Sequence, residues 1–483
     1  MTALWTRAAL EAATGGHLIG EDRAIGGASI DTRTLQPGDL FFAIRGDARD
    51  GHDFVADALG RGAGAAVVRQ DRAEALADQG PVLAVPEAGA DPVLTAMIRL
   101  GAAARARTKA QLVAVTGYVG KTGTKEALRH VLSEQGETHA SAASYNNHWG
   151  VPLTLARMPA SSRYGIFEIG MNHGAEIVPL TAQVRPDIAL ITTLAPAHIE
   201  HFASLAAIAD AKGEIFSGLQ PGGVAILNRD VPHFDRLAAH AHASQAGRIV
   251  TFGEHPDSDV RALKIVLRPD LSVVDAVVMG QPVTYKLGTA GRHAALNSLG
   301  VMAVVHSLGA DLARAALSLG TLTPPAGRGE RTALEIEGGP AYLIDESYNA
   351  NPTAVRAALA TLAGIETGPR GRRIAVLGDM LELGAAAPDL HRGLAEAIEA
   401  AQIDLVFTAG PLTRHLFEAL PVSRRGGVAD TAADLIEPLT RILRPGDAVM
   451  IKGSNGSRMG RIVEALKARY AVDPARRVLA TAP

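Results

Sequence analysis

The strongest constraint on the fold is a regular alternation of short apolar segments with segments of helical character. From residue 111 the apolar segments read QLVAVT, YGIFEIG, DIALITTL and GGVAILN. In the last third of the chain they read AYLIDES, RRIAVLGDM, IDLVFTAG and DAVMIKGS. Strands that are apolar along their whole length and alternate with helices are typical of a parallel sheet covered on both faces. The sequence therefore predicts an α/β fold.

Three domains are expected along the chain. A length of 483 residues is long for one hydrophobic core and favours about three domains. The polar segment GAAARARTKA precedes the regular alternation, and the Pro/Gly-rich segment LTPPAGRGER interrupts it later. These two segments place the domains at residues 1–107, 108–322 and 323–483.

Two regions depart from the simple alternation. In the first hundred residues, DLFFAI and GAAVVR are predicted strands, and HDFVADALGRGA is a predicted helix that ends at glycine. Within residues 251–290, the segment VRALKIVLRPDLSVVDAVVMGQPVTYKLG is typical of an antiparallel meander. The segment GRHAALNSLGVMAVVHSLG then predicts a helix. The central domain is therefore expected to have a mostly parallel sheet.

Composition excludes several classes of function. The formal net charge of −3 and the pI near 6.6 give no sign of a nucleic-acid-binding face. The absence of cysteine excludes disulfides, thiolate metal sites and a cysteine nucleophile. The first residues lack the pattern of a signal peptide, and no apolar run approaches the roughly 20 residues that span a bilayer. We therefore expect a soluble cytoplasmic protein without membrane insertion.

The segment TGYVGKT is the first candidate for chemistry. It lies between the predicted strand QLVAVT and the helix-forming segment KTGTKEALRHVL. Unpaired N–H groups and the helix dipole converge on an anion at such a junction. Gly117 and Gly120 permit close approach of the backbone, Lys121 can reach phosphates, and the Thr122 hydroxyl can bind Mg²⁺. The strict phosphate-loop pattern has glycine where this chain has Val115, so a glycine turn with a solvated lysine is the alternative.

Three polar residues follow on later elements. Glu168 stands at the end of the predicted strand YGIFEIG, where ligands bind in open α/β sheets. His198 follows the strand DIALITTL, and Lys212 lies on the next helix. Taken alone, Glu168 is more typical of a charged strand end and His198 of a surface histidine with its hydrogen bonds made. Lys212 alone is more typical of a solvated lysine.

Taken in order, these four stretches resemble the Mur ligase and folylpolyglutamate synthase superfamily. The resemblance implies ATP and two Mg²⁺ ions, one held by Thr122 and Glu168 and a second held with the help of His198. Lys212 would carry a carbamate that bridges the metals. Two cations bring the anionic ATP and a carboxylate substrate together and stabilise the transferring phosphoryl group.

The resemblance also implies ATP contacts in two later segments. GRHAALNSLG is similar to the adenine-contacting helix start of the family, with Ala294 where the family has asparagine. AGRGER supplies Arg328, which matches an arginine that reaches the γ-phosphate. The implied ATP-binding residues are Thr116, Gly117, Gly120, Lys121, Thr122, Gly123, Thr124, His293, Asn297, Arg328 and Asp345. The implied catalytic residues are Lys121, His198, Lys212 and Arg328.

The outer domains indicate which branch of the family the chain resembles. Residues 29–68 are similar to a UDP-binding N-terminal domain, and LIDESYNANP is the version typical of members that add D-alanyl-D-alanine. The resemblance implies a Rossmann-like C-terminal domain and an ATP-dependent ligase that joins D-alanyl-D-alanine to a UDP-N-acetylmuramoyl-tripeptide through an acyl phosphate. The implied substrate-binding residues are Ser29, Asp31, Thr32, Arg33, Asn146, Asn147, Asn349 and Asn351.

Two alternatives and two departures stay open at this point. The alternatives are a ligase that adds the third amino acid and a P-loop small-molecule kinase, which would leave LIDESYNANP unexplained. The departures are Tyr118 and Gly123, and phosphate binding is expected to survive if Tyr118 projects outward. We expect a monomer, and the third peptide residue, diaminopimelate or lysine, is not determined.

Overall fold

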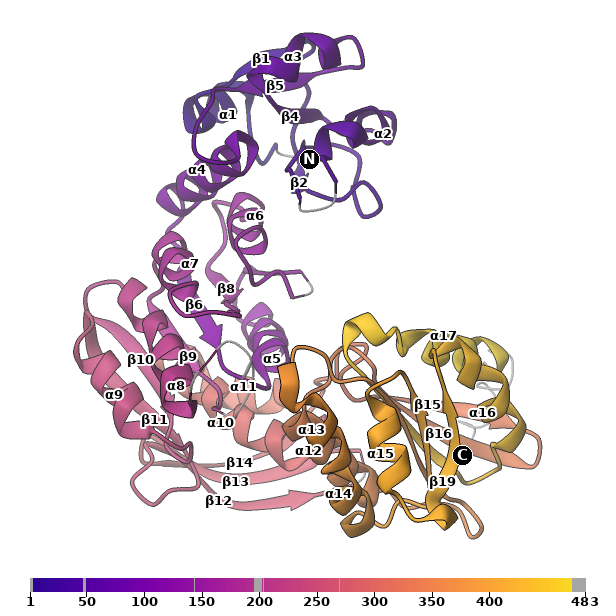
Figure 1. Cartoon of the computed structure of the whole chain (residues 1–483). Coiled ribbons are helices and arrows are strands. Elements are labelled where there is room, and N and C mark those ends of the chain that lie inside the picture. The colour runs from indigo at the N-terminus through magenta and orange to yellow at the C-terminus, as the bar shows by residue number, and fades with distance from the viewer. Residues whose placement is uncertain are drawn as a thin grey trace, which may run out of the picture.

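The chain folds into three lobes that follow one another along an arc (Figure 1). This computed structural model describes residues 3–46, 49–142, 144–194, 202, 204–268 and 270–470. The lobes are built on a five-stranded, a nine-stranded and a six-stranded sheet in chain order. The predicted α/β fold with three domains is confirmed, and the boundaries at residues 107 and 322 stay a prediction. Within the described residues, no helix is both long enough and apolar enough to span a membrane.

The N-terminal lobe has the strand order β1-β5-β4-β3-β2, with β1 antiparallel to β5 and the other neighbours parallel. Its strands are β1 (His17–Ile19), β2 (Gly27–Ser29), β3 (Asp39–Phe42), β4 (Ala65–Arg69) and β5 (Val82–Val85). Its helices are α1 (Arg7–Thr14), α2 (Val55–Gly60), α3 (Gln70–Ala77) and α4 (Pro92–Arg107). The helix predicted at residues 52–63 is shorter, because a 3-10 turn (Gly51–Phe54) precedes α2.

The boundary segment GAAARARTKA is mostly the second half of α4, so the first joint is a helix. The Asp91 side chain begins this helix by accepting hydrogen bonds from two backbone N–H groups. Near its end, the Arg107 guanidinium lies 3.7 Å from the centre of the Trp5 ring and donates to the Met158 carbonyl. Arg105 donates to the Val184 carbonyl at 2.9 Å. The two arginines therefore fasten the N-terminal lobe to the central lobe.

The central sheet has the order β14-β13-β12-β11-β10-β9-β6-β8-β7. Its parallel strands are β6 (Gln111–Thr116), β7 (Thr138–Ala140), β8 (Tyr164–Glu168), β9 (Ile188–Ile191), β10 (Gly223–Asn228) and β11 (Ala246–Gly253). In β6, Val113 and Val115 enter one apolar core while Leu112 and Ala114 enter another on the opposite face. Burial on both faces explains why these strands read as continuous apolar runs.

Helices cover both faces of this sheet. One core includes residues of α5 (Lys121–Ser133), α10 (Arg292–Ser307) and α11 (Leu312–Leu319). The other includes residues of α6 (Gly150–Ala156), α7 (Ile177–Val184), α8 (Leu205–Gly213) and α9 (Phe234–His242). The predicted meander is present as the antiparallel strands β12 (Val260–Leu267), β13 (Ser272–Val278) and β14 (Gln281–Leu287).

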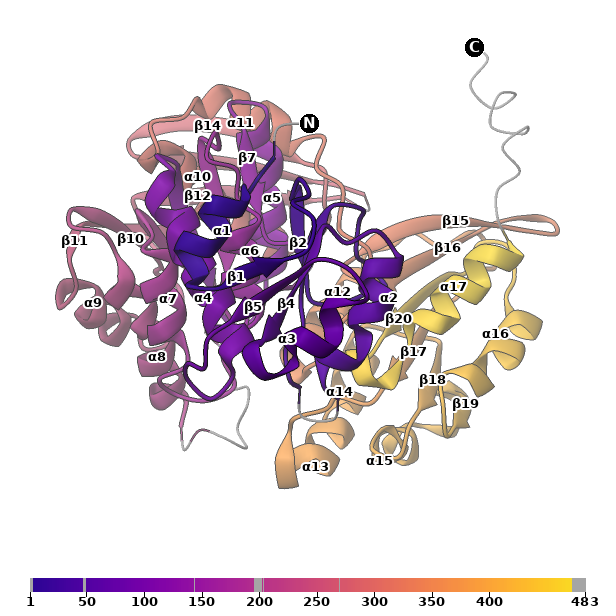
Figure 2. The ribbon, with the colours of Figure 1, turned by 90° about the horizontal axis from the view of Figure 1, so that it is seen from above.

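The C-terminal sheet has the order β15-β16-β20-β17-β18-β19, parallel except for the β15–β16 hairpin. Its strands are β15 (Glu330–Ile336), β16 (Gly339–Glu346), β17 (Arg373–Gly378), β18 (Leu405–Ala409), β19 (Arg425–Ala429) and β20 (Ala448–Lys452). Its helices are α12 (Pro352–Ala363), α13 (Ala387–Arg392), α14 (Leu394–Ala400), α15 (Thr413–Ala419), α16 (Ile436–Ile442) and α17 (Gly460–Arg469). Figure 2 shows α12 on the side that faces the other lobes and β19 on the opposite edge.

Candidate active site

The loop between β6 and α5 is shaped so that only glycine fits at two positions. Gly117 and Gly120 have φ values of 145° and 90°, which side chains rarely permit. A Cβ atom at Gly117 would lie 2.0 Å from Thr192 Oγ1, and one at Gly120 would lie 2.1 Å from Asn297 Nδ2. The loop is therefore a tight backbone turn that opens onto the N-terminus of α5, as an anion cradle requires.

Two other strand ends support this loop. The Thr192 hydroxyl, just after β9, donates to the Val119 carbonyl at 2.8 Å. Asn228, at the end of β10, donates from Nδ2 to the Thr192 carbonyl at 2.8 Å. Sequence reasoning did not select either residue, although both stand at the carboxyl ends of predicted strands, which is the signal that selected Glu168.

Two lysine amines converge on one carbonyl oxygen in this loop. Lys121 Nζ donates to the Gly117 carbonyl at 2.8 Å, and Lys212 Nζ donates to the same oxygen at 3.2 Å. Burial lowers the pKa of Lys212 well below its usual range, and the nearby charge of Lys121 lowers it further. Burial also lowers the pKa of Lys121, against the opposing effect of Glu168. An anion placed here would offset the effect of burial and favour the charged form of the amines.

A hydroxyl and a carboxylate meet beside the lysines. The Thr122 hydroxyl donates to Glu168 Oε2 at 2.8 Å, and Asn146 donates from Nδ2 to Glu168 Oε1 at 2.8 Å. Thr122 and Glu168 are both buried. Hydroxyl and carboxylate oxygens are ligands that Mg²⁺ accepts, so the donor set fits this ion. His198 lies outside the described residues, and the described part of the chain holds no cluster of three His, Asp or Glu side chains that could bind a metal.

Arg328 lies in the segment before the C-terminal sheet and reaches Ser144, which lies beside Thr122. Its Nη2 donates to the Ser144 hydroxyl at 3.2 Å, and its guanidinium lies 4.2 Å from the centre of the Tyr348 ring. The Ser144 hydroxyl also lies 3.2 Å from Thr122 Oγ1. Sequence reasoning missed Ser144, because a single loop serine carries no pattern of its own.

The start of α10 lies between the C-terminal lobe and the loop that joins β6 to α5, residues 117–120. We call this loop the nucleotide loop. Asn297 meets the loop at Gly120, as described above. Burial lowers the pKa of His293, with smaller effects from Glu346 and Lys452 of the C-terminal lobe. A Cβ atom at Gly291 would lie 3.4 Å from Thr361 Oγ1 on α12. His293 and Asn297 therefore stand where two lobes face one another.

Three polar residues after β15 have local hydrogen-bonding roles. The Asp345 carboxylate accepts from the Gly327 N–H at 3.0 Å and from the Ser347 hydroxyl at 2.6 Å. Asn351 caps α12 by accepting from the Ala354 N–H at 2.8 Å. The Asn349 side chain accepts from the Ala350 N–H at 2.9 Å. Asp345 thereby holds the turn that presents Arg328.

The predicted residues of the N-terminal lobe form a separate group. Arg33 is 85% exposed and pairs with Asp31 at 2.6 Å, and this hydrogen bond lowers the pKa of Asp31. The Ser29 hydroxyl donates to the Asp31 carbonyl at 3.0 Å, and Arg61 and then Thr32 lower the pKa of Asp57. None of these contacts joins the nucleotide loop.

Asn147 differs from its neighbour Asn146. Its Oδ1 accepts from the Gly150 N–H at 2.9 Å and so caps α6. The adjacent Asn146 contacts Glu168, as described above.

The two departures in the loop have different surroundings. Tyr118 does not project outward: it is 9% exposed, its ring packs with Val119, and burial raises the pKa of its hydroxyl. Gly123 lies in α5 with no atom within 4 Å of an added Cβ, so threonine would fit there. Thr124 is buried on the same helix, and Thr116 is buried at the end of β6.

A cavity lies in the C-terminal lobe, at the carboxyl ends of β17, β18 and β19. Its volume is about 310 Å³, and the charged side chains that line it are Asp379, Asp430, Arg458 and Arg461. The apolar side chain of Leu381 also lines it. Such a position at the ends of parallel strands is where open α/β sheets bind ligands.

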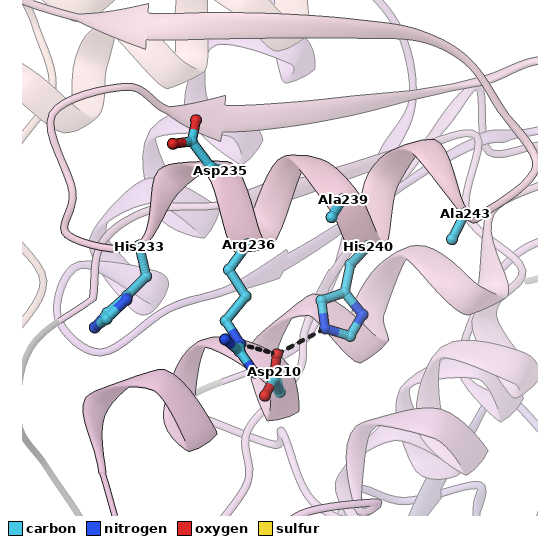
Figure 3. A pocket seen from close by; sticks show the side chains of 7 residues that line it. All are labelled: Asp210, His233, Asp235, Arg236, Ala239, His240 and Ala243. Carbon is cyan, nitrogen blue, oxygen red and sulfur yellow. Dashed lines mark hydrogen bonds and ion pairs between the residues drawn. The ribbon is translucent and has the colours of Figure 1, made fainter.

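A broad surface hollow lies between α8 and α9 (Figure 3). Arg236 and His240 project from α9 toward Asp210 on α8, and the carboxylate accepts from them at 2.5 Å and 3.0 Å. Because these three side chains pair with one another, they connect α9 to α8, the helix that carries Lys212.

The glycine cradle, the lysine pair and the hydroxyl–carboxylate pair define a nucleotide-binding α/β protein of the P-loop class. Its sequence matches the Mur ligase family, catalytic domain, at residues 24–118, the Mur ligase middle domain at residues 115–305 and the Mur ligase, glutamate ligase domain, at residues 327–455. The chain belongs to the Mur ligase family.

Relatives in this family are similar over nearly their whole length. UDP-N-acetylmuramoyl-tripeptide–D-alanyl-D-alanine ligase of Escherichia coli is 34% identical over 94% of this chain and 96% of the relative. The enzyme of the same name from Bacillus subtilis is 31% identical over 92% of this chain and 94% of the relative. A crystal structure of MurF from Acinetobacter baumannii has a TM-score of 0.81 and 28% identity, covering 96% of this chain and 99% of that one.

Proposed function

We propose that this protein is an ATP-dependent ligase that joins D-alanyl-D-alanine to a UDP-N-acetylmuramoyl-tripeptide. The observation that carries the proposal is the convergence of Lys121, the Thr122–Glu168 pair and Arg328 from two lobes on one loop. Full-length relatives of that name support the choice of substrates. The product would be the UDP-N-acetylmuramoyl-pentapeptide used for peptidoglycan.

ATP binding is proposed at the loop and at the start of α10. The N–H groups around Gly117 and Gly120 and the Lys121 amine would bind the phosphates, and His293 and Asn297 would lie by the adenine. Mg²⁺, when bound, supplies positive charge that screens the phosphate oxygens and orients the γ-phosphoryl group. Thr122 and Glu168 would hold one ion, and we propose that His198 and a modified Lys212 help to hold a second.

The reaction needs no nucleophile from the protein. The terminal carboxylate of the tripeptide attacks the γ-phosphorus of ATP, the bond to ADP breaks, and an acyl phosphate forms. The amine of D-alanyl-D-alanine then attacks the acyl carbon, loses a proton and displaces phosphate. Lys121 and Arg328 would stabilise the charge on the transferring group, so catalysis rests on positioning and electrostatics.

A carbamate on Lys212 is part of the proposal. The neutral amine adds to CO₂ and releases a proton, which leaves an anionic carbamate in place of an uncharged amine. Burial beside Lys121 favours the neutral amine over the cation, and the amine that adds CO₂ must be neutral. The resulting anion would suit a place between metal ions and beside a lysine.

The two peptide substrates would occupy the outer lobes. Ser29, Asp31, Thr32 and Arg33, with Asn146 and Asn147, remain our candidates for the UDP-linked tripeptide. For the dipeptide, the cavity in the C-terminal lobe offers carboxylates for an ammonium group and arginines for a carboxylate. Asn349 and Asn351 remain candidates at the edge of that lobe. We also propose a cytoplasmic monomer.

One assay tests this function. The purified protein is given ATP and Mg²⁺ with each peptide substrate alone and then with both, and phosphate release and product mass are measured. The proposal expects full turnover only with both substrates and a product whose mass is their sum less one water. A stable phosphorylated product that accumulates over many turnovers without the dipeptide would establish a kinase instead, because the ligase forms its acyl phosphate only as an intermediate.

A further inference from the structure

Ser144 stands at the meeting point of two lobes and has no role in the reaction described above. Its hydroxyl accepts from Arg328 of the C-terminal lobe at 3.2 Å and lies 3.2 Å from Thr122 Oγ1 of the central lobe. The partners are far apart in sequence, since Ser144 and Arg328 are separated by 184 positions. The contact therefore depends on how the two lobes dock.

The donors and acceptors around Ser144 form a directed chain. Arg328 only donates, so the Ser144 hydroxyl accepts there and is free to donate its hydrogen to Thr122. Thr122 in turn donates to the Glu168 carboxylate at 2.8 Å. The chain thus runs from a guanidinium through two hydroxyls to a carboxylate, and hydrogen bonds in such a chain strengthen one another.

The backbone near Ser144 is held in place independently of the C-terminal lobe. The Asn146 side chain binds Glu168, and the Asn146 carbonyl accepts from the Gly170 N–H at 2.8 Å. On the preceding side, Lys125 Nζ donates to the Ser141 carbonyl at 2.6 Å. The Ser144 hydroxyl is therefore presented by the central lobe as a fixed acceptor for an incoming arginine.

We propose that Ser144 is a positioning residue that docks Arg328, and with it the C-terminal lobe, onto the Thr122–Glu168 pair. This inference rests on the proposed function, because docking places Arg328 beside the transferring phosphoryl group. The Ser144 hydroxyl thereby couples the position of the C-terminal lobe to the Thr122–Glu168 pair.

The first test measures lobe position in the protein without ligands. The chain has no cysteine, so Leu317→Cys on α11 and Val422→Cys in the C-terminal lobe accept spin labels selectively. Both positions are 78% exposed. Double electron–electron resonance on the wild-type background is expected to give one narrow distance population. Ser144→Ala and Arg328→Ala are expected to broaden or shift it in the same way, while Ser144→Thr keeps it.

Ser161→Ala is the matched control, because the exposed Ser161 hydroxyl binds only the surface carboxylate of Glu137 among its described contacts. Its distance population should equal that of the wild type. The proposal is overturned if Ser144→Ala leaves the distance distribution unchanged, or if Ser161→Ala changes it equally.

The second test separates docking from folding by kinetics. Loss of a hydrogen bond to a charged group lowers kcat of Ser144→Ala by roughly 10- to 100-fold, with little change in KM for ATP. Ser144→Thr should restore most of kcat. In the Arg328→Ala background, Ser144→Ala should add little further loss, whereas independent, multiplicative losses would overturn the proposal. A wild-type protein without dipeptide-dependent turnover would refute the function, while the distance measurement would still test the docking.

Discussion

At the residue scale, the nucleotide loop brings two lysine amines onto a single carbonyl oxygen. The amines of Lys121 and Lys212 lie 2.8 Å and 3.2 Å from the oxygen of Gly117. Like charges in a buried place are unfavourable without an anion, and their mutual effect lowers the pKa of Lys212. The phosphates of a nucleotide, or a carbamate, would supply the missing negative charge.

Lys121→Met should abolish most ligation, because the amine is lost where charge develops on the phosphoryl group. We expect kcat/KM to fall roughly 100- to 1,000-fold, as for loss of one donor to a transition-state anion. The kcat/KM of the variant is measured from the phosphate release that depends on the dipeptide. Lys109→Met, at an exposed lysine before β6, is the control. Near-normal turnover of Lys121→Met would refute the assignment of the loop.

The pH dependence of stability should carry the signature of Lys212. Because its pKa is lowered in the folded chain, the unfolded chain binds more protons between that lowered pKa and the usual lysine value of about 10.4. The free energy of unfolding therefore rises with pH in this window. Urea unfolding between neutral pH and about pH 9, in metal-free buffer without CO₂, should show a smaller slope for Lys212→Met. The exposed Lys264→Met should keep the wild-type slope, and equal slopes for all three proteins would contradict the prediction.

Lys212→Ala should lose activity and regain part of it with added short carboxylates. Acetate or formate can occupy the space of the lost side chain and provide the oxygen ligands of a carbamate. Turnover is measured at increasing acetate concentration, with chloride at equal ionic strength as the control. If chloride restores as much activity as acetate, Lys212 does not act as a carbamate.

At the element scale, the turn from β6 into α5 decides whether a cradle forms. Gly120 begins the helix in a left-handed conformation, and Gly123 lies one turn later on an exposed helical surface. The two glycines share a helix but not a role, since only the first is required by the backbone. Sequence patterns alone treat both as members of one glycine-rich motif.

Gly120→Ala and Gly123→Ala should therefore change stability in opposite directions. A side chain at φ of 90° costs about 1–3 kcal/mol, and nucleotide binding should weaken with it. Alanine at Gly123 meets no atom and should stabilise the protein by about 0.5–1 kcal/mol. Urea unfolding of both variants measures the difference. Equal effects of the two substitutions would contradict the backbone argument.

At the scale of the whole molecule, the two joints between lobes differ in kind. The first joint is the continuous helix α4, whose arginines bind the central lobe. The second is an irregular Pro/Gly-rich segment without a helix or strand between α11 and β15. We therefore expect the N-terminal lobe to be fixed and the C-terminal lobe to be the one that closes, which is consistent with delivery of Arg328 and the dipeptide to the loop.

Arg107→Ala should loosen the first joint without harming the nucleotide loop. The variant loses the Trp5 ring contact and hydrogen bonds to two carbonyls, a loss of about 1–3 kcal/mol. Thermal unfolding should shift downward and KM for the UDP-linked substrate should rise, while ATP affinity is retained. Arg72→Ala, at an exposed arginine of α3, is the control. An unchanged unfolding temperature would show that the helix alone fixes the lobe.

The sequence by itself determined the class of fold, the meander and the nucleotide loop. Each is encoded locally: burial on both faces makes a strand such as β6 apolar throughout, and a tight loop demands Gly117 and Gly120. The family motifs in the sequence indicated the proposed substrates.

Only the tertiary structure decided which distant residues meet. It brought Ser144 to Arg328, buried Tyr118 beside Val119, and placed most of the polar boundary segment before β6 in α4. Hydrophobic periodicity reports whether a side chain is buried, but not against which partner. Contacts between residues 184 positions apart depend on strand order and lobe docking, which no local pattern encodes.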